Sequence, residues 1–166
     1  MAAAPNYNPV QYDGDVIYIN GLNNYQINID NDNNRLIVKP KVINKNEIIY
    51  EEVTNSTILE SSINEQPQQI SKYDYRTISI NLIKKINQIS NIPFNTILRN
   101  SGFTYEIGNV NYKVNYCYIH EFNASIKGVD AFGTLKIIKK LSETYGYSTK
   151  IKICTSTGLM INYVFE

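Results

Sequence analysis

Between residues 16 and 53, short apolar runs have the pattern of β-strands, and in one of them Tyr25, Ile27 and Ile29 alternate with polar residues. The apolar runs of this region lie at 16–19, 25–29, 35–39 and 47–53. Turn-forming residues separate these runs: Asn20-Gly21, the asparagine-rich segment 30–34, Pro40 and the segment 44–46. Short alternating runs between closely spaced turns are typical of antiparallel strands. We therefore predict a β meander of three or four strands.

Three later segments have the spacing of helices. Ile80, Ile83, Ile86 and Ile89 recur at helical intervals and predict a helix within 77–90. A short helix should follow between residues 91 and 102, because Asn91 is a suitable N-cap, Pro93 fits the first turn and Gly102 suits the position after the last turn.

The third helix is expected within 130–146. Leu135, Ile138, Leu141 and Tyr145 would form its buried face, with Asp130 as the cap and Gly146 as the stop.

Two hairpins are predicted around this third helix. The first joins 103–107 to 111–122 through Gly108-Asn109, and the second joins 147–155 to 159–165 through residues 156–158. The predicted fold class is α+β: an antiparallel β meander followed by two helices and a ββαββ C-terminal unit.

The N-terminal segment and one internal segment lack any periodicity. Residues 1–14 contain two prolines and predict an extended N-terminal arm, and residues 15–166 predict a single α+β domain with a long polar loop at about 54–74. Loops of that length usually have a function such as contacting a neighbour. The candidate contacts of the arm are Pro5, Tyr7, Pro9 and Tyr12.

Composition and charge argue against some classes of function. The net charge is +1 and the pI about 7.7, which argues against a general nucleic-acid binder and against attraction to an anionic membrane. The sequence shows no signal peptide and no apolar run long enough for a membrane span. The chain is rich in Ile, Asn and Lys, has 14 tyrosines and lacks tryptophan. AT-rich codons specify these abundant residues, which indicates an AT-rich source such as a phage, a large DNA virus, a protist or some bacteria.

The segment 29–36 resembles the start of a calcium-binding loop, because oxygen-bearing side chains alternate from Asp30. An EF-hand loop requires glycine at its sixth position and glutamate at its twelfth. Arg35 and Lys41 occupy these positions here. Because Asn and Asp favour turns, we predict that the segment is a hairpin tip.

Catalytic and metal-binding residues are scarce. His120 is the only histidine, and it could join Cys117 and Cys154 in a zinc site only if their strands adjoined and a fourth ligand were found. Residues three apart on a strand, such as Cys117 and His120, also point to opposite faces. No nucleophile motif or phosphate-binding loop is present. We predict a protein that is not an enzyme and needs no metal or cofactor.

The most unusual pattern is a tyrosine-rich segment at 112–122. On one continuous strand, its aromatic residues would share a face, together with Val114: Tyr112, Tyr116, Tyr118, His120 and Phe122. Such a face suits a core or a subunit interface, since tyrosine is apolar at one end and polar at the other. It could also stack the bases of single-stranded nucleic acid, although the glycine and basic residue of the RRM signature are missing.

These observations favour a non-enzymatic structural or interaction subunit of a larger assembly. We expect a phage or viral particle component, such as a connector, ring, tail or capsid-associated protein, located in the virion or the cytoplasm. Its partners would be other protein subunits, with a homo-oligomer inside a larger complex, and nucleic acid or membrane is not expected. The alternative is a small nucleic-acid-binding or regulatory protein that uses the strand 112–122.

Overall fold

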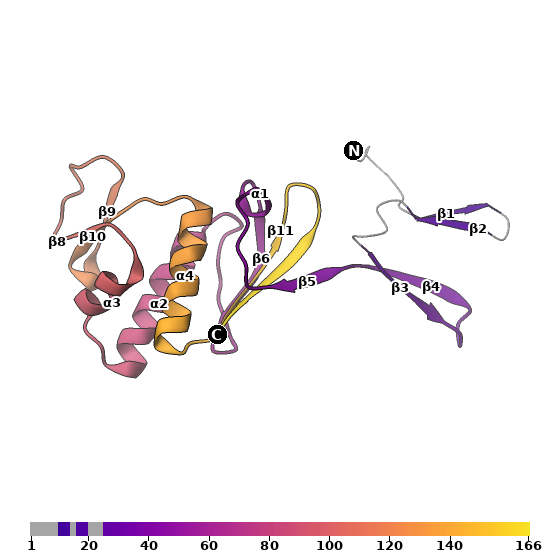
Figure 1. Cartoon of the computed structure of the whole chain (residues 1–166), viewed down its shortest axis with the longest axis horizontal. Coiled ribbons are helices and arrows are strands. Elements are labelled where there is room, and N and C mark those ends of the chain that lie inside the picture. Colours follow the sequence, from indigo (N-terminus) through magenta and orange to yellow (C-terminus); the bar gives the residue numbers. More distant parts are fainter. Residues whose placement is uncertain (1–9, 14–15, 20–24) are drawn as a thin grey trace. The chain divides into compact units, whose positions relative to one another are not determined.

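The computed structural model describes residues 10–13, 16–19 and 25–166, with burial and side chains described from residue 25 onward. The chain forms two compact units, Met1–Val42 and Ile43–Glu166. This division differs from the expected arm of 14 residues followed by one domain, because the boundary lies near residue 42. Figure 1 labels the elements of both units.

The N-terminal unit contains two antiparallel hairpins. β1 (Val10–Asp13) pairs with β2 (Val16–Ile19), and β3 (Tyr25–Asp30) pairs with β4 (Arg35–Pro40). The end of the predicted extended arm is thus a paired strand. Residues 1–9 lie outside the described part of the chain.

The C-terminal unit is built on a five-stranded antiparallel sheet with the order β5-β12-β11-β6-β7. Its strands are β5 (Val42–Lys45), β6 (Thr57–Ile63), β7 (Gln66–Pro67), β11 (Thr149–Cys154) and β12 (Met160–Phe165). β11 and β12 form the predicted closing hairpin, and Gly158 in its turn has a φ of 87°. Glycine adopts this left-handed backbone without strain.

Four helices complete this unit: α1 (Tyr50–Val53), α2 (Tyr75–Ser90), α3 (Phe94–Ser101) and α4 (Ala131–Tyr145). The three longer ones confirm the three helices predicted from apolar spacing and from cap residues. Asp130 caps α4 by accepting a hydrogen bond from the Gly133 N–H at 2.7 Å. The predicted N-cap Asn91 is instead the left-handed C-cap of α2, and Pro93 stands at the N-cap of α3.

A three-stranded sheet and a short 3₁₀-helix lie between α3 and α4 in the sequence. The order is β8-β10-β9, formed by β8 (Tyr105–Ile107), β9 (Tyr116–Ile119) and β10 (Ala124–Lys127). The expected pairing of 103–107 with 111–122 is therefore wrong, because β10 lies between β8 and β9 and pairs with both. The register of this sheet is set by β10, which follows both strands of the predicted hairpin in the sequence.

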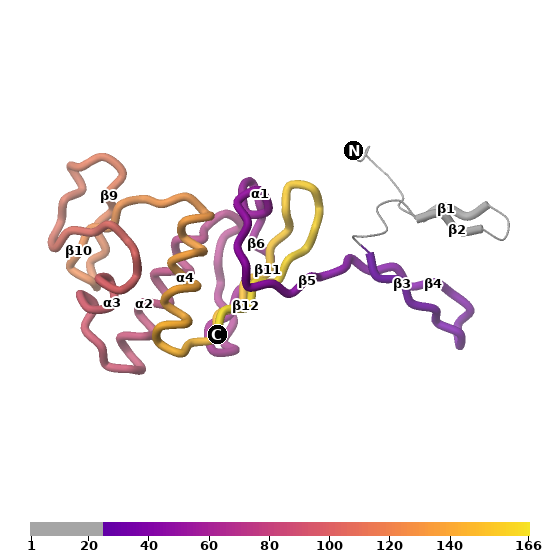
Figure 2. The backbone as a smooth tube through the Cα atoms, in the orientation of Figure 1, coloured from indigo at the N-terminus to yellow at the C-terminus, as the bar shows by residue number. Residues whose placement is uncertain are grey.

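The helices α2 and α4 pack against each other between the two sheets, as the ribbon and the backbone trace show (Figures 1 and 2). The inner face of the five-stranded sheet is apolar and fully buried, with Ile151, Ile153, Ile161, Tyr163 and Phe165 at 0% exposure. α2 and α4 contribute Leu82, Ile83, Leu135 and Ile138 to the same core. This burial of apolar area is the main stabilising contribution to the C-terminal unit.

Two further sequence predictions in this unit are corrected. The polar loop expected at 54–74 contains β6, a strand of the main sheet, because Ile58 and Ile63 are buried on its inner face. A bulge places Leu59 outside the regular pairing between β6 and β11, which disrupts the alternation in the sequence. A strand was expected at 47–53, but the second half of this segment, Tyr50–Val53, forms the short helix α1.

The α+β class is confirmed, with mixed helices and antiparallel sheets. The predicted meander is resolved into two separate hairpins and β5, which belongs to the five-stranded sheet. Among the described residues, the longest helices are too short and too polar to span a membrane.

Candidate functional site

The β3–β4 hairpin has one apolar and one polar face. Residues directly opposite each other on an antiparallel pair lie on the same face of the ribbon. The three cross-strand pairs on one face are all apolar: Tyr25–Pro40, Ile27–Val38 and Ile29–Leu36. We call these six residues the β3–β4 apolar face. The pairs of the opposite face are mostly polar: Gln26–Lys39, Asn28–Ile37 and Asp30–Arg35.

No residue of this hairpin is buried. Within 25–42, every residue is half-buried or exposed, and Ile29 remains 69% exposed. The apolar face therefore lacks the cover that the main sheet receives from α2 and α4. Within the face, Ile29 and Pro40 are exposed and the other four residues are half-buried. Large contiguous apolar patches at a protein surface mark interaction sites.

The tip of the hairpin is the segment that resembles a calcium loop. The prediction of a hairpin tip is confirmed, since residues 31–34 form the turn between β3 and β4. The Asp30 carboxylate accepts hydrogen bonds from the Asn33 side-chain amide at 2.9 Å and from Arg35 Nε at 3.0 Å. These two contacts, with that of Asn33 first, hold the pKa of Asp30 below its ordinary value. The carboxylate thus stabilises the turn.

The tyrosine-rich segment does not form the single face that the sequence predicted. Only Tyr116 and Tyr118 lie on β9, which is four residues long. Tyr112 precedes the strand and is 81% exposed, whereas Phe122 is buried and its ring packs on Phe94 with centroids 4.6 Å apart. Asn115, with a left-handed φ of 64°, directly precedes the strand, and the short 3₁₀-helix His120–Phe122 follows it.

Part of the tyrosine segment does remain together. The rings of Tyr118 and His120 meet edge to face at 6.2 Å, and the Tyr118 hydroxyl donates to the Asn123 side chain at 3.1 Å. β9 is an edge strand, but the Asn111 side chain accepts the backbone N–H of Tyr118 at 2.7 Å. This contact uses a donor that a further strand would need. The strand therefore offers two tyrosines for stacking the bases of a nucleic acid, whereas the sequence predicted five aromatic side chains on one face.

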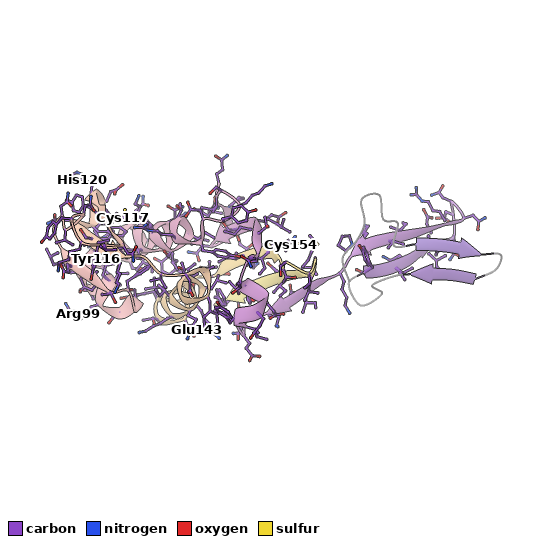
Figure 3. All side chains as sticks on the ribbon, turned by 90° about the horizontal axis from the view of Figure 1, so that it is seen from above. Arg99, Tyr116, Cys117, His120, Glu143 and Cys154 are labelled. Carbon is purple, nitrogen blue, oxygen red and sulfur yellow. The ribbon has the colours of Figure 1, made fainter. Side chains whose placement is uncertain are left out.

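The two cysteines and the histidine are not brought together. Cys117 lies on β9 of the small sheet and Cys154 on β11 of the main sheet, so the strands do not adjoin. Figure 3 shows Cys117 and His120 at one end of the C-terminal unit and Cys154 at the other. Within the described ranges, no group of three or more His, Cys, Asp or Glu side chains has the arrangement of a metal site.

The candidate arm contacts fall mostly outside the described residues. Pro5, Tyr7 and Pro9 are not described, and Tyr12 is known only by its place on β1, opposite Ile17. These four residues stay a prediction from the sequence.

The outer face of the main sheet is open but polar. Lys150 pairs with Glu65 at 2.7 Å and Lys152 with Glu60 at 3.5 Å, and Asn162 lies opposite Lys152 on β12. The Glu65 carboxylate raises the pKa of Lys150 by hydrogen bonding to its ammonium group. Exposed ion pairs of this kind add little stability, but they let the face remain in water without a partner.

Comparison with protein-family models, curated proteins and solved structures finds no match to this chain. The site is therefore assigned on geometry alone. We take the β3–β4 apolar face as the candidate site because its three cross-strand pairs are all apolar and none of its residues is buried. The sequence contains its signal, because Tyr25, Ile27 and Ile29 alternate with polar residues, but this pattern alone predicts only a strand of the meander.

Proposed function

We propose that this protein is a non-enzymatic structural or interaction subunit of a larger assembly, and that it docks through the β3–β4 apolar face. The observation that supports the proposal is a six-residue apolar face on a hairpin that buries no residue. An isolated two-stranded hairpin is marginally stable in water, and a third strand or a packed partner is needed to stabilise it. A neighbouring subunit would supply this partner.

The occupant that we propose for this face is a second copy of the same chain. The face contains no charged residue, so two copies can approach without charge repulsion. A twofold contact makes each face its own partner, as in most homo-oligomers. Two amphipathic ribbons packed in this way place Gln26, Lys39 and Arg35 on the outside, in water.

The assembly that we favour is a phage or viral particle, with the protein in the virion or in the cytoplasm before assembly. The AT-rich residue usage supports this choice of source. In this proposal, residues 1–9 would add contacts to neighbouring subunits.

The test is the oligomeric state of variants matched in charge. Ile29→Glu places a carboxylate on the apolar face, and Gln26→Glu places one on the opposite face of the same strand, across from Lys39. In sedimentation velocity runs over a concentration series, we expect the wild type and Gln26→Glu to associate and Ile29→Glu to remain a monomer.

Two outcomes contradict the proposal. A wild type that stays monomeric at every concentration excludes the second copy as the occupant. If the amides of β3 and β4 in that monomer also exchange slowly with deuterium, the hairpin is stable by itself and needs no partner.

A further inference from the structure

A polar depression of about 480 Å³ lies beside the start of α2 in the C-terminal unit. Its lining comes from three separate segments of the chain: Arg76, Asn115, Tyr116, Cys117, Gly128 and Val129. The volume lies within the range of small-molecule sites. Gly128 contributes to the shape, because its N–H donates to the Asn115 carbonyl at 2.6 Å and an added Cβ would come within 3.4 Å of that oxygen.

Arg76 is the only cation that lines this depression, and it lacks a counter-charge there. One nitrogen of its guanidinium group, Nη2, is buried and has no hydrogen-bond partner. No ion pair joins Arg76 to an acidic side chain among the residues that the structure describes. A buried donor without a partner is unfavourable, and more so when it belongs to a charged group.

The acidic side chains of the neighbouring segments already have other partners. Asp74 caps α2 by accepting the Thr77 N–H at 3.0 Å, and Asp130 caps α4. Glu106 pairs with Lys113 at 2.5 Å, and Glu121 with Lys84 at 3.0 Å. Arg76 therefore differs from the paired lysines of this unit.

We propose that the depression binds an oxyanion, either a carboxylate or a phosphate group, through the Arg76 guanidinium. The planar fork of N–H donors matches both groups and forms paired hydrogen bonds with their oxygens. Arg76 is also the second residue of α2, where the helix dipole favours negative charge. The Tyr116 ring and the polar side chain of Asn115 would contact the rest of the ligand.

Anion binding by the full-length protein tests this proposal. Inorganic phosphate and acetate are titrated separately by calorimetry, with chloride at matched ionic strength as the reference. We expect saturable binding of at least one of the two anions to the wild type. The preferred anion identifies the chemical class of the natural ligand.

Two substitutions of arginine separate the site from general charge. Arg76→Gln should weaken anion binding at least tenfold, whereas Arg99→Gln, which removes an exposed guanidinium from α3, should leave binding unchanged. Arg76→Lys keeps the charge without the planar fork and should bind at an intermediate level. Since Arg76 has no internal partner, Arg76→Gln should also unfold at the wild-type temperature or higher when the anion is absent.

A second pair of variants keeps the test valid if Arg76→Gln fails to fold. Val129→Glu places a carboxylate at the depression, and Leu59→Glu places one at a position of similar exposure on β6 (42% and 43%). Only Val129→Glu should weaken anion binding. Binding that is equal in the wild type, Arg76→Gln and Val129→Glu overturns the proposal, and so does a wild type that binds neither anion.

Discussion

The five-stranded sheet and the β3–β4 hairpin have similar alternating sequences but different surroundings. In β11 and β12, every second residue is fully buried beneath α2 and α4. In β3 and β4, the corresponding apolar residues stay half-buried or exposed. The difference shows that alternation predicts which residues share a face, while the cover over that face depends on elements far away in the sequence.

The two regions also differ in the face that each leaves open, which is polar in the main sheet and apolar in the hairpin. The open face of the main sheet presents Lys150 and Lys152, each paired with a glutamate. That face is compatible with water, so the sheet needs only the cover that its own helices provide. The β3–β4 apolar face has no such charges, and for this reason the docking role is proposed for the hairpin.

Truncating one isoleucine in each region should give the largest difference between them. Ile151 is fully buried between Ser61 and Tyr163 in the register of the sheet, and Ile29 is 69% exposed. Ile151→Ala should lower the free energy of unfolding by about 3 kcal/mol, through lost burial and the cavity that remains. Ile29→Ala should change the free energy of unfolding of the monomer by less than about 0.5 kcal/mol.

Urea denaturation at a concentration where the protein is monomeric measures both values. If both variants lost the same free energy of unfolding, the β3–β4 apolar face would be covered within one chain and would not differ from the main sheet.

Local signals in the sequence predicted the helices and the hairpin tip. Asp130 and Gly146 set the ends of α4 because a side-chain acceptor and a left-handed glycine act within one turn. Asn34 has a φ of 51° at the end of the β3–β4 turn, which matches the tolerance of asparagine for this backbone. These features depend on few neighbouring residues, so the sequence alone is sufficient to find them.

The features that the sequence missed depend on distant residues. The sequence predicts a loop where β6 lies, because Glu60 and Ser62 face outward and the bulge at Leu59 interrupts the alternation of apolar and polar residues. The tyrosine segment predicts one strand because tyrosine favours strands, yet the left-handed Asn115 precedes β9 and the 3₁₀-helix His120–Phe122 follows it. The depression joins Arg76 to residues that follow it by 39 to 53 positions in the sequence, and no local pattern indicates it.

The deep burial of the main sheet also predicts a loss of stability at alkaline pH. Burial, with the nearby charge of Glu52 as a second cause, raises the pKa of Tyr163 from 10.0 to about 12. Between these two pH values, the unfolded chain loses the phenol proton while the folded protein keeps it. The contribution of Tyr163 to stability is therefore full below pH 10 and falls as the pH rises toward 12, by on the order of 1 kcal/mol.

Tyr163→Phe has no such proton to lose, so its free energy of unfolding should fall less steeply over this pH range. Tyr73→Phe, which removes an exposed phenol, is the matched control and should follow the wild type. Urea denaturation at several pH values provides the comparison. Parallel curves for the wild type and Tyr163→Phe would show that this phenol ionises equally well in the folded and unfolded protein.

The smallest expected effect lies at the tip of the hairpin. Asp30 accepts hydrogen bonds from Asn33 and Arg35, and its pKa is lowered, so its carboxylate supports the turn at neutral pH and loses this effect as the pH falls through its folded-state pKa. Asp30→Asn should remove that pH dependence while leaving the unfolding of the C-terminal unit unchanged. Amide chemical shifts of residues 31–36 followed by NMR during an acid titration report the turn directly. If the shifts of residues 149–165 moved together with those of the tip, the two units would unfold as one, and the hairpin would owe its stability to the C-terminal unit rather than to a partner.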